Sequence, residues 1–166
     1  MAFARIVAWK SPCTIRWVSY RSRKLPTDSA EDPKVELVEN TQMAYVIAVD
    51  HIHFAGPDAN AMREWYAKVL NARRTTRGPM LAAELPGVAL IFQATSHPVV
   101  GTAGRVLDHV TFEVRGLAAF CDRLQAAGIK LDRPYTNVPA LNIAIAFIYD
   151  PWGTYIELTE VLDKVQ

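Results

Sequence analysis

A motif that occurs twice limits what this chain can fold into. Residues 49–54 read Val-Asp-His-Ile-His-Phe, and residues 107–112 read Leu-Asp-His-Val-Thr-Phe. Each copy has the β-branched and aromatic residues of a strand, and each precedes a segment with the apolar periodicity of a helix. Two similar copies predict a duplicated structural unit rather than a solenoid, because a solenoid repeats its unit more often.

Composition narrows the class of protein. A chain of 166 residues with 51% hydrophobic residues can fill the core of one domain or of two small modules. The net charge of +1 gives no electrostatic reason to expect nucleic acid or membrane as a partner. Cys13 and Cys121 form no CxxC motif or disulfide framework, which favours a reducing compartment such as the cytoplasm. Cys121 lies among apolar residues and is expected to be a buried structural thiol.

The first 44 residues differ from the rest and are predicted to be an extension of the domain. Residues 1–27 contain six basic and no acidic residues, with serines between them, which is typical of an organellar transit peptide and of a mitochondrial protein. The alternatives are a poorly ordered leader or a start codon assigned too far upstream. Residues 27–33 predict a linker, and residues 35–38 predict either a short strand or no regular structure. The domain itself is expected to span residues 45–162.

The first module, about residues 45–96, is predicted to begin with a strand and a helix and to continue with strands. Alternation along the first strand places His51 and His53 on one face. Asp58 is a candidate helix N-cap, and Asn71 suits the helix end. The predicted elements are a strand at 44–55, a helix with the apolar stripe Met62, Trp65, Tyr66 and Val69, and strands at 80–84 and 88–94.

A basic cluster follows this helix and consists of Arg73, Arg74 and Arg77. We interpret the cluster as a solvated edge of the module. Contact with an anionic substrate is the alternative.

The second module, about residues 105–162, predicts the same order of elements. Gly128 is placed to end its helix, and residues 150–153, Asp-Pro-Trp-Gly, predict a tight turn with proline early and glycine last. The predicted elements are a strand at 105–114, a helical stripe of Leu117, Phe120, Cys121 and Leu124, a strand beginning at 129–131, a loop at 134–139, and strands at 142–149 and 154–159.

These motifs carry a family resemblance. The two Asp-His motifs, the helix end Ala-Ala-Gly-Ile at 126–129 and the closing Asp-Pro-Trp-Gly-Thr-Tyr-Ile-Glu-Leu at 150–158 resemble the vicinal oxygen chelate superfamily. That group includes glyoxalase I, bleomycin- and fosfomycin-resistance proteins, methylmalonyl-CoA epimerase and extradiol dioxygenases. The resemblance covers about residues 45–162. It implies an α+β fold in which two βαβββ modules form a cup-shaped, mostly antiparallel mixed sheet with helices outside and a divalent metal ion inside. It also implies a homodimer, because two such modules often cannot close the cup alone.

Transferred by position, the resemblance implies His51, His109 and Glu157 as metal ligands. Imidazole and carboxylate donors suit Zn, Ni, Mn, Co or Fe(II) and leave open positions for a substrate. The alternative for each histidine is a residue satisfied within the core. His53 stands where the second copy has Thr111, so it is a candidate to replace His51 as ligand or to contact the substrate.

The first module departs from the glyoxalase I pattern. Aligning residues 87–91 with residues 153–157 puts Ile91 at the position of Glu157, and isoleucine can neither bind a metal nor accept a proton. Gln93, on the same strand, is the nearest candidate for a fourth ligand or a substrate contact. Tyr149 and Tyr155 flank the closing turn and are candidates for orienting the substrate, with packing as their alternative role.

The expected function is that of a divalent-metal-dependent, glyoxalase-like lyase or isomerase, acting on a small substrate that chelates the metal through vicinal oxygens. His53 and Tyr149 are its candidate catalytic residues, and Gln93 and Tyr155 its candidate substrate-binding residues. One alternative is an Fe(II) extradiol-type ring-cleaving dioxygenase, and another is a non-catalytic protein that binds a small molecule in the manner of bleomycin-resistance proteins. A thiol transferase of fosfomycin-resistance type also uses three ligands.

Overall fold

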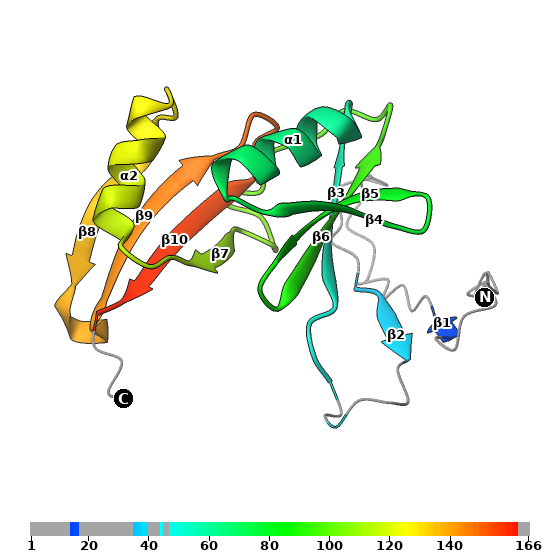
Figure 1. Cartoon of the computed structure of the whole chain (residues 1–166), viewed down its shortest axis with the longest axis horizontal. Coiled ribbons are helices and arrows are strands. Elements are labelled where there is room, and N and C mark those ends of the chain that lie inside the picture. The colour runs from blue at the N-terminus through cyan, green and yellow to red at the C-terminus, as the bar shows by residue number, and fades with distance from the viewer. Residues whose placement is uncertain (1–13, 17–34, 40–43, 45–46, 163–166) are drawn as a thin grey trace. The chain divides into compact units, whose positions relative to one another are not determined.

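The structure, a computed structural model, describes residues 14–16, 35–39, 44 and 47–162, and divides into two units, Met1–His97 and Pro98–Gln166 (Figure 1). Most of the predicted leader or transit peptide, and the whole predicted linker at 27–33, lie outside the described residues. Within the described part of the chain, no helix is long and apolar enough to cross a membrane.

The first unit contains a four-stranded mixed sheet and one helix. Its strands follow the order β3-β6-β5-β4, with β3 parallel to β6 and the other neighbours antiparallel. The elements are β3 (His51–Gly56), α1 (Ala59–Val69), β4 (Arg73–Arg77), β5 (Met80–Leu85) and β6 (Val88–Ala94).

The second unit repeats this topology. Its strands follow the order β7-β10-β9-β8, again with the outer strand β7 parallel to its neighbour and the other pairs antiparallel. The elements are β7 (Val110–Glu113), α2 (Leu117–Ala126), β8 (Leu131–Val138), the 3-10 helix η1 (Pro139–Leu141), β9 (Ile143–Tyr149) and β10 (Tyr155–Val161). The predicted α+β class and the duplicated βαβββ module are therefore confirmed.

Helix α1 begins and ends where its sequence predicts. The Asp58 carboxylate accepts a hydrogen bond from the Ala61 amide at 2.9 Å, and Asn71 takes a positive φ of 56° just beyond the last turn. The buried Tyr66 ring packs 4.9 Å from Phe54 of β3 and 5.3 Å from Phe92 of β6, centroid to centroid. These contacts hold the helix against one face of the sheet, so His51 and His53 lie on the opposite face.

Helix α2 is capped from a distant strand. Gly116 precedes it in a left-handed conformation and has no side chain to offer, but Glu160 of β10 accepts hydrogen bonds from the amides of Gly116, at 2.6 Å, and Leu117, at 3.0 Å. Gly128, with φ of 80°, ends the helix as predicted. Cys121 is buried against the sheet, as expected, and burial raises the pKa of its thiol.

One strand was not assigned from the sequence, and one predicted loop was wrong. Residues 73–77, interpreted as a solvated basic edge, form strand β4 against β5. Residues 134–139, predicted to be a loop, belong mostly to β8. This strand lies at an edge of its sheet, and its register shifts once on each side of Arg133. An edge position with register shifts tolerates Pro134, which has no amide hydrogen to pair.

The segment before the first module also contains strands. Thr14–Arg16 forms β1, which pairs antiparallel with β2 (Leu37–Glu39). The strand that the sequence left open at 35–38 is therefore present, displaced by one or two residues.

Candidate metal centre

Strand register shows which residues of the two units correspond. Glu157 of β10 lies opposite Thr111 of β7, and Ile91 of β6 lies opposite His53 of β3. The pairing confirms that Ile91 occupies in the first unit the position of Glu157 in the second. Ile91 is fully buried and cannot supply an oxygen.

In the second unit, His109 lies between two carboxylates. Its Nε2 is 3.0 Å from Glu157 Oε2, and its Nδ1 is 2.7 Å from Asp108 Oδ1. The amide of Gly104 donates to the other oxygen of Asp108 at 2.5 Å. The hydrogen bonds with His109 and Gly104 lower the pKa of Asp108, so this carboxylate stays charged at neutral pH and holds Nδ1–H.

Two threonines orient Glu157. Thr111 Oγ1 donates to Oε2 at 3.3 Å, and Thr159 Oγ1 donates to Oε1 at 3.1 Å. The Glu157 side chain is only 17% exposed, whereas that of His109 is 36% exposed. The carboxylate is thus fixed beside the imidazole, and the imidazole remains partly accessible to solvent.

An aromatic stack adjoins this pair. The Tyr155 ring lies 4.6 Å from that of Tyr149 and 4.9 Å from that of Phe147, centroid to centroid. Tyr155 is buried and its hydroxyl donates to Asp132 at 2.9 Å; burial and this hydrogen bond raise the pKa of Tyr155 to about 12. Tyr149 is 42% exposed, so of the two predicted tyrosines it is the one accessible to a ligand.

In the first unit, His51 has a similar environment. Its Nδ1 lies 2.7 Å from Asp50 Oδ2 and its Nε2 lies 3.3 Å from Glu36 Oε2. Arg77 donates to Asp50. Partial burial alone would raise the pKa of Asp50, but the hydrogen bonds with Arg77 and His51 outweigh it and lower the pKa.

His53 lies beside His51, with the ring centroids 5.5 Å apart and edge to face. Burial and the neighbouring His51 lower the pKa of His53, so its imidazole is neutral at pH 7. Glu36, His51 and His53 each offer a ligand atom, and these atoms all lie within 4.8 Å of one another. Gln93 is exposed on β6 two residues beyond Ile91, and therefore on the sheet face that carries His53.

The structure divides the predicted ligands between the two units. It brings His109 and Glu157 together in the second, and His51 together with His53 in the first. Sequence reasoning missed Glu36, because no spacing or motif connects a carboxylate in the N-terminal segment with the histidines of β3.

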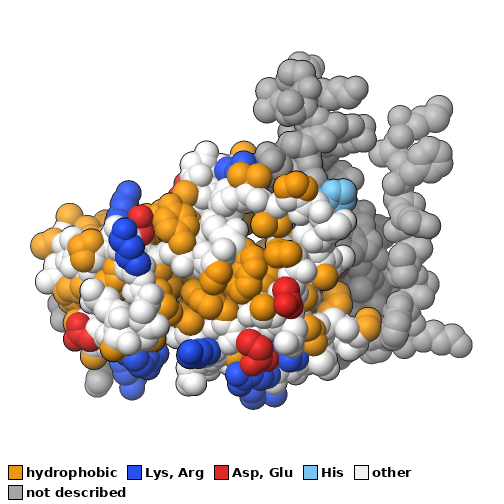
Figure 2. Space-filling view, turned by 90° about the horizontal axis from the view of Figure 1, so that it is seen from above, with side chains coloured by type: hydrophobic (Ala, Val, Ile, Leu, Met, Phe, Trp, Pro, Cys, Tyr) orange, Lys and Arg blue, Asp and Glu red, His pale blue; other side chains and the backbone are white. Residues whose placement is uncertain are grey.

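The three arginines of the basic cluster are all paired with carboxylates. Arg73 contacts Glu84, Arg74 lies 2.8 Å from Glu64, and Arg77 contacts Asp50. Figure 2 shows the same tendency on one face, where several Lys and Arg side chains have acidic side chains beside them. These pairs support the interpretation as a solvated edge rather than an anion site.

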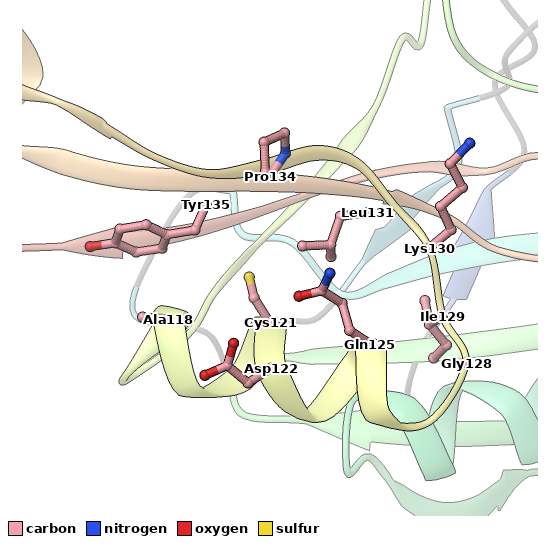
Figure 3. A pocket seen from close by; sticks show the side chains of 10 residues that line it. All are labelled: Ala118, Cys121, Asp122, Gln125, Gly128, Ile129, Lys130, Leu131, Pro134 and Tyr135. Atoms are coloured by element: carbon pink, nitrogen blue, oxygen red, sulfur yellow. The ribbon is translucent and has the colours of Figure 1, made fainter.

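A groove of about 760 Å³ lies in the second unit, between α2 and the start of β8 (Figure 3). Cys121 and Gln125 of the helix face Leu131 across it, and Tyr135 closes one end. None of the predicted site residues lines the groove. The raised pKa of Cys121 keeps its thiol protonated at neutral pH, so it is a poor nucleophile.

Comparison with protein families identifies the class. The model of the Glyoxalase/Bleomycin resistance protein/Dioxygenase superfamily matches residues 48–158, which is more than half of the chain. The protein therefore belongs to this superfamily, and the resemblance in its motifs is confirmed. A search of curated proteins found no match.

Several solved structures share the fold. A glyoxalase/bleomycin resistance protein/dioxygenase from Nocardioides is 19% identical, with a TM-score of 0.57 over 75% of this chain and 90% of that one. Lactoylglutathione lyase from Agrobacterium tumefaciens is 17% identical, with a TM-score of 0.53 over 68% and 92%. Oxidase ChaP-H2 is 20% identical, with a TM-score of 0.55 over 70% and 94%. At these identities the likeness concerns the fold alone.

Proposed function

We propose that this protein is a divalent-metal-dependent lyase or isomerase of glyoxalase type, whose small substrate presents two vicinal oxygens to the metal. His51, His109 and Glu157 are its metal ligands. The observation that carries the proposal is the arrangement of His109, which has Asp108 at one ring nitrogen and Glu157 at the other.

The chemistry of this arrangement favours a cation between His109 and Glu157. A neutral imidazole has one N–H, and the hydrogen bond to Asp108 places it on Nδ1. The Nε2 lone pair then faces a carboxylate oxygen at 3.0 Å, which is repulsive unless a proton or a metal ion lies between them. Two donor atoms that each lie about 2.1 Å from one metal ion, at an angle between 90° and the tetrahedral value, are about 3.0–3.4 Å apart. The distance between His109 Nε2 and Glu157 Oε2 therefore fits two ligands of the same ion.

The remaining residues suit the handling of a substrate. A bound divalent ion would act as a Lewis acid toward the substrate oxygens. His53, neutral at pH 7, is the candidate to accept a proton, and Tyr149 is the exposed hydroxyl for orienting the substrate. Gln93 supplies an amide on the His53 face, and Tyr155 supplies an aromatic wall rather than a free hydroxyl.

A second candidate function uses the same ligands. Two histidines and one carboxylate with open positions are the facial triad of Fe(II) oxygenases, and one structural neighbour bears the name oxidase. An Fe(II) extradiol-type dioxygenase is therefore the alternative. A protein that only binds its small molecule is the third, and the ordered Glu157 carboxylate argues against it because sequestration needs no metal ligand.

Metal analysis tests these candidates. Protein purified without added metal should contain stoichiometric divalent metal, and His109→Ala and Glu157→Ala should each abolish its retention. Nickel or zinc supports the lyase or isomerase, whereas iron with ring cleavage of a catechol supports the dioxygenase. Unchanged metal content in both variants would refute the metal centre.

Assembly is part of the proposal. Two βαβββ modules are expected to close the cup around the ligands within a homodimer. The mass of one chain is 18.5 kDa, and analytical ultracentrifugation should give twice this mass. A monomer would contradict this expectation.

A further inference from the structure

We infer that Glu36 is a metal ligand supplied by the N-terminal segment, and that it binds the same ion as His51 in place of the carboxylate that the first module lacks. The inference rests on the proposed function in taking His51 as a ligand. It adds a residue from outside the family domain, since the family match begins at residue 48.

The surroundings of His51 and His109 correspond between the two units. In each, the aspartate before the histidine engages Nδ1 at 2.7 Å, and a glutamate oxygen lies beside Nε2. The glutamate is Glu157 at 3.0 Å in the second unit and Glu36 at 3.3 Å in the first. The fold would have placed the equivalent of Glu157 at position 91, but an isoleucine stands there. Glu36 thus supplies by a different route the carboxylate that position 91 lacks.

The side chains of His51 and Glu36 are both partly buried. His51 is 11% exposed and Glu36 is 15% exposed, so both lie largely out of water. Asp50 holds Nδ1–H of His51, and the lone pair of Nε2 therefore faces Glu36. A carboxylate and an imidazole lone pair that face each other largely out of solvent are favourable only with a proton or a metal ion between them, and a bound metal ion meets this need.

A second imidazole, that of His53, adjoins this pair. The candidate ligand atoms of Glu36, His51 and His53 lie within 4.8 Å of one another, close enough to surround one ion. The imidazole of His51 and the carboxylate of Glu36 are donors with affinity for Zn, Co, Ni or Fe(II), and His53 lies beside them. An ion held by His51 therefore has the Glu36 carboxylate within reach.

Cobalt titration of the full-length chain tests the inference. Metal-free protein is titrated with CoCl₂, and both the affinity, by calorimetry, and the visible absorption bands, which report the ligands of Co(II), are recorded. Glu36→Gln should weaken Co(II) binding at least tenfold and alter the bands, whereas Glu36→Asp, which retains a carboxylate, should recover part of the affinity. Glu84→Gln removes the same charge from a glutamate of β5 paired with Arg73, and should change neither quantity.

Other outcomes separate this inference from the proposed function. If Glu36→Gln matches the wild type in affinity and spectrum while His109→Ala loses cobalt, Glu36 is not a ligand and the proposed function stands. If Glu36→Gln and His51→Ala lose cobalt while His109→Ala and Glu157→Ala retain it, the Glu36 inference holds and the proposed ligand set fails.

A purely structural role for Glu36 is also distinguishable. In that case Glu36→Gln would lower the melting temperature of the metal-free protein and leave the cobalt spectrum unchanged, which would overturn the inference.

Discussion

His109 Nε2 lies 3.0 Å from Glu157 Oε2, and both side chains reach this contact from neighbouring parts of the second unit. Thr111 and Thr159 hold the carboxylate, and Asp108 holds the other side of the ring. Three hydrogen-bonding side chains thus support a contact that a proton or a metal ion must complete. This pre-organisation is typical of metal centres, in which outer hydrogen bonds orient the ligands.

Glu157 and Glu160 share a strand but have different roles, and charge-neutral substitutions should separate them. Glu157→Gln should weaken Co(II) binding at least tenfold with little change in thermal stability, because it alters a proposed ligand without removing packing. Glu160→Gln should leave Co(II) binding by the folded protein unchanged, because Glu160 contacts the start of α2. Calorimetric titration checks both. Equal effects of the two substitutions on Co(II) affinity would contradict the assignment of Glu157 to metal binding and of Glu160 to capping α2.

Glu160→Ala should destabilise the second unit. The substitution removes the acceptor for the amides of Gly116 and Leu117, and Gly116 has no side chain to replace it. Loss of a helix cap costs about 1–2 kcal/mol, and the free energy of unfolding in urea should fall by that amount. Glu84→Ala, at an exposed ion pair, is the matched control and should cost under about 1 kcal/mol.

Asp108→Asn should weaken metal binding without removing a ligand. The aspartate fixes the proton on His109 Nδ1, so that Nε2 is left free to bind a metal. Loss of such a supporting carboxylate typically reduces metal affinity about 10–100-fold. We expect a smaller loss than for His109→Ala in the same titration. A Co(II) affinity equal to that of the wild type would show that Asp108 does not influence metal binding by His109.

Tyr155→Phe should reveal a pH-dependent contribution to stability. Tyrosine ionises near pH 10 in an unfolded chain, whereas burial and the hydrogen bond to Asp132 raise the pKa of Tyr155 to about 12 in the folded protein. A raised pKa means that the hydroxyl contributes fully below about pH 10, and that the contribution is lost as the pH rises towards 12.

Urea unfolding at several pH values measures this contribution. At pH 8 the wild type should exceed Tyr155→Phe by about 1 kcal/mol, the usual net value of one hydrogen bond. The difference should shrink above pH 10. A difference that stays constant up to pH 12 would show that the contribution of Tyr155 does not depend on its ionisation.

Gly153→Ala should destabilise the turn before β10. Gly153 has φ of 93°, and a Cβ there would lie 2.9 Å from the Cα of Gly101. Both the conformation and the contact with backbone are unfavourable, so we expect a loss of about 1–3 kcal/mol in the free energy of unfolding. Gly87→Ala, at a turn with positive φ but open space around it, should cost less. The reverse order would contradict the role of the Gly101 contact.

Local patterns in the sequence were sufficient to predict the duplicated module and some residues of the candidate metal centre. Strand alternation and helical periodicity act over a few residues, so they predicted the paired elements, the Asp58 cap and the correspondence of Ile91 with Glu157. The closing motif likewise predicted Glu157 as a candidate ligand. Strand β4 and the later part of β8 escaped prediction, because pairing with β5 and β9 outweighs the weak strand propensity of their residues.

Contacts between distant parts of the chain could not be obtained from those patterns. Nothing local signals that Glu36 lies beside His51, that Asp132 accepts the hydrogen bond of the Tyr155 hydroxyl, or that Glu160 caps α2. Each contact joins residues from separate elements, and the packing of the sheets decides which of them meet. The Asp-His motif therefore placed a carboxylate beside each histidine in the sequence, whereas the folded chain determined which ring nitrogen it contacts and which carboxylate faces the other.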